Sequence, residues 1–207
     1  MGSDPGRRVG VLISGRGSNL QALIDAVAAG RLRAEIAIVI ANRADAAGLA
    51  RARTAGIETL TVPHRDYPTR EAFEATLVAE LRARRVALVC LAGFMRLLGP
   101  TFLEAFPSAV LNIHPSLLPA FPGVDAQRQA WTYGTKIAGA TVHFVTGELD
   151  GGPIVLQRAV AVADDDTPDT LAARILEVEH EIYPEAAGLV LDGAWTIDGR
   201  RFRRTAP

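Results

Sequence analysis

Three polar residues, Asn112, His114 and Asp150, have the chemistry to carry a proton and to stabilise a negative charge. Asn112 and His114 alternate with Leu111 and Ile113 at the end of an apolar run, so on a strand both polar side chains point to the same side. An amide donor beside an imidazole could stabilise a developing oxyanion and transfer a proton. A hydrogen-bonded core histidine is the competing interpretation.

Asp150 precedes two glycines in the turn-rich segment TGELDGG (146–152). Most aspartates in such turns bond their own backbone. A carboxylate beside a histidine would instead favour the imidazolium and fix its orientation. The spacing does not by itself bring Asp150 to His114, so both interpretations stay open. His64 and His143 complete no ligand set with metal spacing, and no metal site is expected.

The segment SGRGSN (14–19) joins an apolar run to a helical pattern. Its glycines would let the backbone approach a ligand, and Ser18 and Asn19 are expected to cap a helix whose N–H groups face an anion. A dinucleotide fingerprint would need a glycine at Leu20 and an acid near Asn42, so we expect a lone phosphate rather than NAD. A glycine turn without any ligand is the alternative.

The elements that must position these residues alternate between apolar strand-length runs and amphipathic helix-length segments. Strands are predicted at 7–14, 34–42, 57–63, 86–93 and 109–114, and helices at 18–30, 44–55 and 70–84. This alternation is typical of a parallel sheet with helices on both faces, whose ligands bind beyond the carboxyl ends of the strands.

The pattern changes after about residue 135. Antiparallel strands are predicted at 136–145 and 153–162, a helix at 167–190 that begins at Thr167 and Pro168, and a strand or hairpin at 194–203. The predicted fold is therefore α/β: a Rossmann-like three-layer sheet, mostly parallel in the N-terminal half, with antiparallel strands in the C-terminal third.

The composition bounds the class of protein. A chain of 207 residues with 49% hydrophobic and 22% charged residues is typical of one globular domain and excludes disorder over most of its length. A net charge of −1 argues against nucleic acid as the main partner. No apolar run reaches the ~18 residues of a membrane helix, and the first residues lack the apolar middle of a signal peptide. We expect a cytoplasmic protein in which Cys90 is buried rather than catalytic.

Five sequence blocks resemble the phosphoribosylglycinamide formyltransferases, a family of folate-dependent enzymes of purine biosynthesis, and they follow that family's order. They are ISGRGSNLQALIDA, LAGFMRLL, LNIHPSLLPAFPG, HFVTGELDGGPI and EHEIYP. The resemblance covers about residues 8–200. It implies one formyltransferase domain over 7–207, after a flexible arm at 1–6. Two of the blocks, LNIHPSLLP and ELDGGPI, are shared with the wider superfamily, whereas SGRGSN indicates the branch that uses the ribonucleotide.

The resemblance also implies a role for each candidate residue. The catalytic set would be Asn112, His114 and Asp150. The residues that hold the ribonucleotide would be Gly17, Ser18, Asn19 and Glu179. The residues that hold the folate would be Arg70, Asn112, Met95, Arg96, Leu97 and Leu98. Arg70 would lie near the folate's glutamate tail, and the 95–98 backbone would hold the pterin.

The implied reaction transfers the formyl group of 10-formyltetrahydrofolate directly to the amine of glycinamide ribonucleotide. Its products are formylglycinamide ribonucleotide and tetrahydrofolate. No metal is required, the partners are these small molecules, and the protein would be a monomer or a homodimer.

The chain departs from the family in two places. Asp125 and Gln127 stand in a segment where the family often has histidine, and Gly147 stands where an acid is common. Neither departure touches the three catalytic positions.

The main alternative function is that of a 10-formyltetrahydrofolate hydrolase, which shares the Asn, His and Asp but passes the formyl group to water. Such hydrolases carry an N-terminal regulatory domain, whereas the first predicted strand here begins at about residue 7, so we favour the transferase. A methionyl-tRNA formyltransferase would need a C-terminal RNA-binding domain. A non-catalytic binding module would have lost one of the three catalytic groups.

Overall fold

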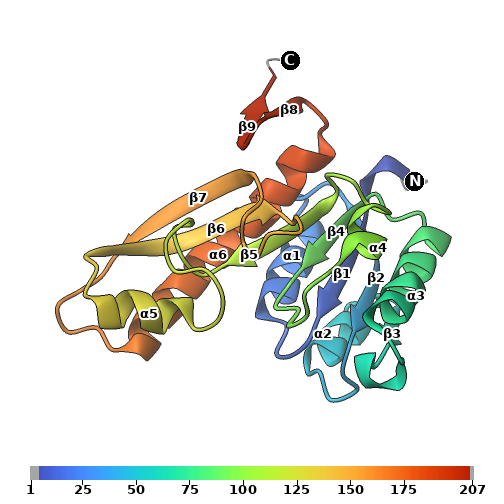
Figure 1. Ribbon diagram of the computed structural model, residues 1–207, viewed down its shortest axis with the longest axis horizontal. Coiled ribbons are helices and arrows are strands. Elements are labelled where there is room, and N and C mark those ends of the chain that lie inside the picture. Colours follow the sequence, from blue (N-terminus) through green and yellow to red (C-terminus); the bar gives the residue numbers. More distant parts are fainter. Residues whose placement is uncertain (1–4, 206–207) are drawn as a thin grey trace.

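The computed structural model describes residues 5–205, which contain one nine-stranded sheet with the strand order β3-β2-β1-β4-β5-β6-β7-β9-β8 (Figure 1). The parallel part consists of β1 (Arg8–Ile13), β2 (Glu35–Ala41), β3 (Thr59–Thr61), β4 (Leu88–Leu91) and β5 (Val110–His114). From β5 onward the sheet continues antiparallel into β6 (Ile137–Phe144) and β7 (Ile154–Ala161). The hairpin of β8 (Trp195–Asp198) and β9 (Arg201–Arg204) completes the edge. The predicted fold class is confirmed.

Helices cover both faces of the sheet and bury two separate apolar clusters. One cluster packs one face of the sheet against α1 (Ser18–Ala28), α2 (Gly48–Thr54), α5 (Ala126–Tyr133) and α6 (Pro168–Leu191). The other packs the opposite face of the sheet against α3 (Arg70–Ala83) and α4 (Pro100–Leu103). Successive residues of β1 alternate between the clusters, since Val11 and Ile13 belong to the first and Leu12 to the second. Burial on both faces explains why this strand is continuously apolar.

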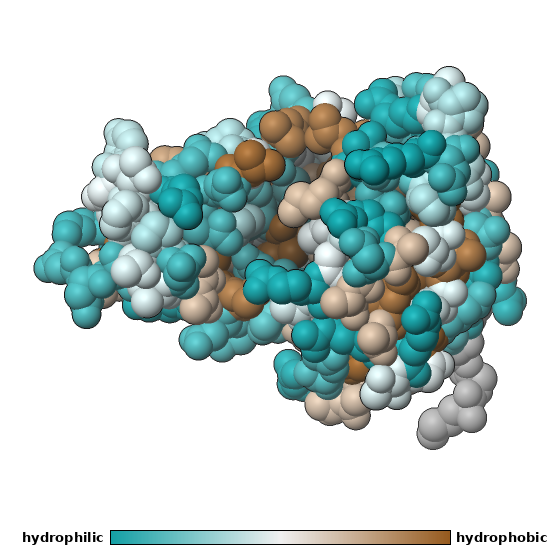
Figure 2. Space-filling model, turned by 90° about the horizontal axis from the view of Figure 1, so that it is seen from below, coloured by the Kyte–Doolittle hydropathy of each residue, from teal (hydrophilic) through white to brown (hydrophobic). Residues whose placement is uncertain are grey.

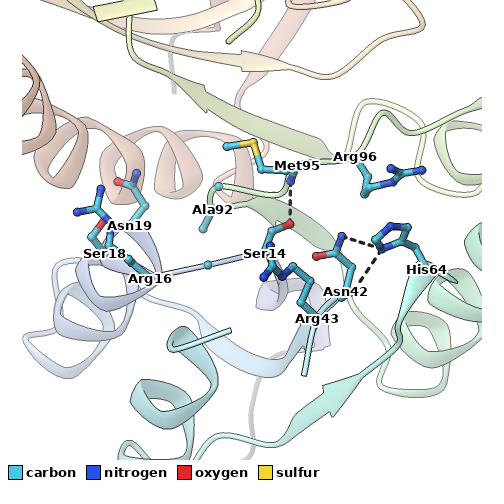
Figure 3. A pocket seen from close by; sticks show the side chains of 13 residues that line it. Ser14, Arg16, Ser18, Asn19, Asn42, Arg43, His64, Ala92, Met95 and Arg96 are labelled. Atoms are coloured by element: carbon cyan, nitrogen blue, oxygen red, sulfur yellow. Dashed lines mark hydrogen bonds between the residues drawn. The ribbon is translucent and has the colours of Figure 1, made fainter. Parts of the chain in front are cut away.

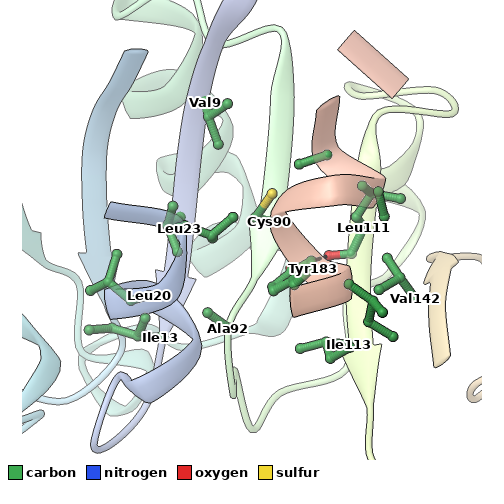
Figure 4. Close-up of a cluster of buried hydrophobic side chains, with 14 of the residues drawn as sticks. Val9, Ile13, Leu20, Leu23, Cys90, Ala92, Leu111, Ile113, Val142 and Tyr183 are labelled. Atoms are coloured by element: carbon green, nitrogen blue, oxygen red, sulfur yellow. Dashed lines mark hydrogen bonds between the residues drawn. The ribbon is translucent and has the colours of Figure 1, made fainter. Parts of the chain in front are cut away.

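Tyr183 of α6 connects the helix layer to the strands that carry the site. Figure 4 shows Tyr183 between the strands of Cys90 and Leu111. Its hydroxyl lies 3.0 Å from the carbonyl oxygen of Leu91 and 3.1 Å from that of Leu111. Cys90 is fully buried beside it, as expected, and burial raises the pKa of the thiol to about 12. The thiol therefore stays protonated at neutral pH, which is not the state of a nucleophile.

Several predicted boundaries need correction. The helix expected at 44–55 begins only at Gly48, because residues 43–47 form turns in which Arg43 pairs with Asp45. Two helices, α4 and α5, were not predicted. The start of α6 is confirmed: Thr167 caps it, and the Thr167 and Thr170 side chains bond each other's backbone N–H groups. The predicted flexible arm falls mainly on residues 1–4, outside the described residues, and Pro5–Arg7 forms a short 3₁₀ turn.

Gly152 holds the loop after β6 against the strand. A Cβ atom at Gly152 would lie 1.8 Å from the carbonyl oxygen of Phe144, whereas a Cβ atom at Gly147 would meet nothing within 4 Å. Gly152→Ala should therefore lower the free energy of unfolding by about 1–3 kcal/mol or more, measured by urea denaturation. Gly147→Ala, in the same loop, is the control and should unfold like the wild type. Equal stability of the two variants would contradict the tight contact.

Candidate active site

The strand pair β5–β6 brings Asn112 and His143 face to face at the carboxyl end of β5. The Asn112 Nδ2 atom lies 3.2 Å from His143 Nε2, and His143 Nδ1 lies 2.9 Å from the carbonyl oxygen of Phe144. Because a carbonyl only accepts, Nδ1 carries the proton and Nε2 accepts a hydrogen bond from the amide. Burial lowers the pKa of His143, which favours this neutral form. One amide hydrogen of Asn112 is thus fixed and the other is left for a ligand.

Asp150, in the loop between β6 and β7, lies against both histidines. Its Oδ2 atom is 3.5 Å from His114 Nδ1, and its Oδ1 atom is 3.8 Å from His143 Nε2. The backbone N–H of Gly123 donates to Asp150 Oδ2 at 2.7 Å. The His114 and Asp150 side chains are only 5% and 10% exposed, so little solvent screens their interaction. The structure therefore brings Asp150 to His114, the contact that the spacing left open.

The orientation of the His114 ring follows from its second nitrogen. His114 Nε2 lies 2.8 Å from the carbonyl oxygen of Phe121, so Nε2 carries a proton and Nδ1 faces the carboxylate of Asp150. Protonation of Nδ1 would give an imidazolium held between a carbonyl and a carboxylate. Such a group can donate a proton and stabilise a nearby negative charge.

His143 is the site residue that sequence reasoning missed. His143 was considered only as a metal ligand, and its spacing to other residues matches no metal site. The available signal was its place in the apolar run ATVHFV (140–145), where a polar side chain on a buried strand needs a partner. That partner is Asn112, directly opposite in the register.

The loop SGRGSN lies at the carboxyl end of β1 and turns into α1. The helix is preceded by Gly17 at φ +71°, and no side chain caps it among the described residues. The expected capping by Ser18 and Asn19 is therefore wrong, because both residues lie within the first helical turn. Asn19 Nδ2 instead donates to Glu179 Oε2 of α6 at 2.6 Å, which brings two of the predicted ribonucleotide residues together.

Asn19 and Glu179 form a buried polar pair with spare acceptors. Glu179 is 5% exposed, and burial raises the pKa of its carboxyl although the Asn19 hydrogen bond opposes the shift. The Oδ1 atom of Asn19 is buried and has no hydrogen-bond partner within residues 5–205. Buried polar atoms are normally satisfied, so this oxygen is suited to a ligand donor group.

Glu179→Gln should stabilise the protein at neutral pH and should weaken the ribonucleotide binding that the sequence predicts for this residue. A raised pKa means that the folded state binds the proton more tightly than the unfolded state, so stability falls as pH rises above the ordinary value of 4.5. Glutamine does not ionise, so the stability of the variant does not fall in this pH range. Urea denaturation should therefore show a stability gap that is present at pH 7 and closes below pH 4.5. Ribonucleotide affinity should fall about tenfold through loss of a charge-assisted hydrogen bond. A gap independent of pH would contradict the buried titration.

A cavity of about 450 Å³ connects the segments that follow β1, β2, β3 and β4 (Figure 3). Its lining consists of residues 14–19, 42–43, 64, 92–93 and 95–96. The backbone N–H of Met95 donates to Ser14 Oγ at 2.8 Å, which ties the predicted ribonucleotide and folate segments together. Asn112, His114 and Asp150 do not line this cavity: Asn112 and His114 lie on the next strand of the sheet, β5, and Asp150 contacts His114 from the loop between β6 and β7.

The predicted folate residues begin at the cavity, where Met95 and Arg96 line it, and continue away from it through Leu97 and Leu98. The side chains of Met95, Arg96 and Leu97 are exposed, whereas Leu98 is buried, so only the backbone of Leu98 could meet a ligand. Glu74 connects Arg70 to the end of the segment 95–99, because it contacts both. Glu74 accepts from the Gly99 N–H at 2.6 Å and lies 3.6 Å from Arg70 Nε. Figure 2 shows apolar side chains gathered along a hollow in the middle of one face of the molecule.

Within residues 5–205, no group of three or more His, Cys, Asp or Glu side chains could hold a metal ion. The expected independence of metal stays a prediction. The described helices include none that is long and apolar enough to cross a membrane.

Comparison with known proteins gives consistent matches. The formyl transferase family model matches residues 7–187. The chain is 47% identical over 190 residues to the phosphoribosylglycinamide formyltransferase of Escherichia coli (strain K12), covering 92% of this chain and 87% of that protein. It is 46% identical to the trifunctional purine biosynthetic protein adenosine-3 of Drosophila melanogaster, of which it spans only 14%. The crystal structure of glycinamide ribonucleotide transformylase 1 from Symbiobacterium toebii matches with a TM-score of 0.94 at 55% identity, covering 96% and 94% of the two chains.

Proposed function

Because the chain belongs to the formyl transferase family, we propose that it transfers the formyl group of 10-formyltetrahydrofolate to the amine of glycinamide ribonucleotide, a step of purine biosynthesis. The products are formylglycinamide ribonucleotide and tetrahydrofolate. The observation that carries the proposal is the contact of Asp150 with His114, beside Asn112 and one strand away from the SGRGSN cavity.

The reaction needs one bond formed, one bond broken and one proton moved. The amine nitrogen of the glycinamide attacks the formyl carbon, and negative charge develops on the formyl oxygen. The free amide hydrogen of Asn112 and the protonated His114 stabilise this oxyanion. The bond between the formyl carbon and N10 of the folate then breaks. The proton released by the amine reaches N10 through His114 or water, while Asp150 balances the imidazolium charge.

The binding residues follow from the chemistry of the two substrates. The uncapped N–H groups at Gly17 and Ser18 suit the ribonucleotide phosphate, and the acceptors of Asn19 and Glu179 suit its hydroxyl or amine groups. Arg70 suits the carboxylates of the folate tail. Met95 and Leu97 offer exposed apolar side chains next to the backbone that would hold the pterin.

The alternative hydrolase reaction would use water in place of the amine. Two of the three relatives named above are a glycinamide ribonucleotide transformylase and a phosphoribosylglycinamide formyltransferase, and these favour the transferase.

The test is a spectrophotometric assay of a 10-formyl folate with and without glycinamide ribonucleotide. Turnover that requires the ribonucleotide would support the proposal. Turnover without the ribonucleotide would favour the hydrolase. No turnover in either assay, with folded protein, would indicate a binding module.

A further inference from the structure

The cavity beside the SGRGSN loop has an unbalanced charge. Its lining contains three arginines, Arg16, Arg43 and Arg96, and no aspartate or glutamate. Arg43 is neutralised by Asp45, whose Oδ2 lies 2.7 Å from Arg43 Nη2. Arg96 follows Met95 on the side of the predicted folate segment. Arg16 is thus the one lining arginine that belongs to the SGRGSN loop itself.

The guanidinium of Arg16 is not used by the fold. The side chain is exposed, and within residues 5–205 it makes no ion pair or hydrogen bond. Figure 3 places Arg16 with Ser18 and Asn19 at the start of α1. The buried Oδ1 of Asn19, which has no partner within residues 5–205, is an independent sign that this place is built to bind a ligand with a hydrogen-bond donor, such as a ribose hydroxyl beside the phosphate.

The backbone beneath Arg16 is held firmly by α2. Arg51 Nε donates to the carbonyl oxygen of Arg16 at 3.0 Å, and the Gly48 N–H donates to the carbonyl oxygen of Gly15 at 3.0 Å. A Cβ atom at Gly17 would lie 2.7 Å from the Cα atom of Gly48, so the two backbones are in close contact. A loop held in this way presents its side chain with little reorganisation when a ligand binds.

The charge of a phosphate monoester exceeds what the helix end can balance. A helix N-terminus supplies roughly half an elementary charge, whereas the phosphate carries about −1.5 to −2. A guanidinium adds a full charge and a fork of N–H donors that fits two phosphate oxygens.

We propose that Arg16 contacts the 5′-phosphate of the ribonucleotide and selects for its charge, an inference that rests on the proposed function. Arg51 is a positioning residue for this contact, because it holds the Arg16 backbone. Arg16→Ala should raise the KM for glycinamide ribonucleotide about 10- to 100-fold, the loss expected for a hydrogen bond to a charged group. The kcat at saturation and the KM for the formyl folate should not change. Arg16→Lys should recover part of the loss, since lysine supplies the charge without the fork.

The control is Arg31→Ala, which removes another exposed arginine, beyond the other end of α1. Binding of ribose 5-phosphate, measured by calorimetry, supplies a readout that needs no turnover. Weaker binding in Arg16→Ala, but not in Arg31→Ala, supports the contact even if the transferase assay fails. Wild-type KM and wild-type binding in Arg16→Ala, with an active transferase, would overturn the contact and leave the proposed function standing.

Discussion

His114→Ala should lower kcat by about 10²- to 10⁴-fold, the range for removal of a general acid–base. The imidazole is buried between Asp150 and the carbonyl oxygen of Phe121, which hold the ring in one orientation. Alanine removes both the proton carrier and the positive charge near the oxyanion. The ribonucleotide affinity, measured by calorimetry, should stay at the wild-type value because His114 does not line the cavity.

The Phe121 contact requires a second variant. His114→Ala also removes a hydrogen bond to the loop, so part of its effect could come from loop movement. His114→Gln can retain a donor to Phe121 but cannot carry a proton, and it should be nearly as inactive. His180→Ala is the matched control, since His180 lies on α6 and, within residues 5–205, neither pairs with Asp150 nor lines the cavity. Near-normal turnover in either His114 variant would remove His114 from the reaction.

The fold could be predicted from the sequence because its parallel strands are buried on both faces. Continuous apolar runs such as residues 9–13 and Leu88–Leu91 are visible without any knowledge of their neighbours. Helix α5 could not be seen in this way. Only Ala126 and Ala130 of its eight residues are buried, and two alanines do not make an apolar stripe.

Helix α4 was missed for a different reason. It has four residues, and its start is held from a distance by Glu74 of α3, which accepts from the N–H groups of Gly99 and Phe102. A carboxylate that caps a helix some 25 residues away in sequence leaves no local signal.

The candidate site was predictable where it depends on strand alternation. Asn112 and His114 share a side because they are two residues apart on one strand. The contact of Asp150 with His114 depends on how the loop after β6 returns across β5, which spacing does not encode. The role of His143 depends on the pairing of β5 with β6, whereas the sequence pattern predicted only the pairing of β6 with β7.

Asp150→Asn should lower kcat by about 10²- to 10⁴-fold, comparable to the loss of other buried aspartates that orient a catalytic histidine. The variant keeps the side-chain shape and can still accept the Gly123 N–H, so the fold should be retained. It removes the negative charge 3.5 Å from His114 Nδ1, and the imidazolium loses its counter-ion. Glu148→Gln is the control in the same loop. Its exposed pair with Arg200 should contribute little, and its kcat should stay at the wild-type value.

The double variant shows whether Asp150 acts through His114. If the carboxylate serves only to stabilise and orient the imidazole, Asp150→Asn added to His114→Ala should cost almost nothing further. If the two effects instead multiply, Asp150 contacts the reacting groups independently, for example by moving the proton through water. Wild-type kcat in Asp150→Asn alone would contradict both roles. The carboxylate would then serve the Gly123 loop, and the melting temperature of an Asp150→Ala variant would measure that contribution.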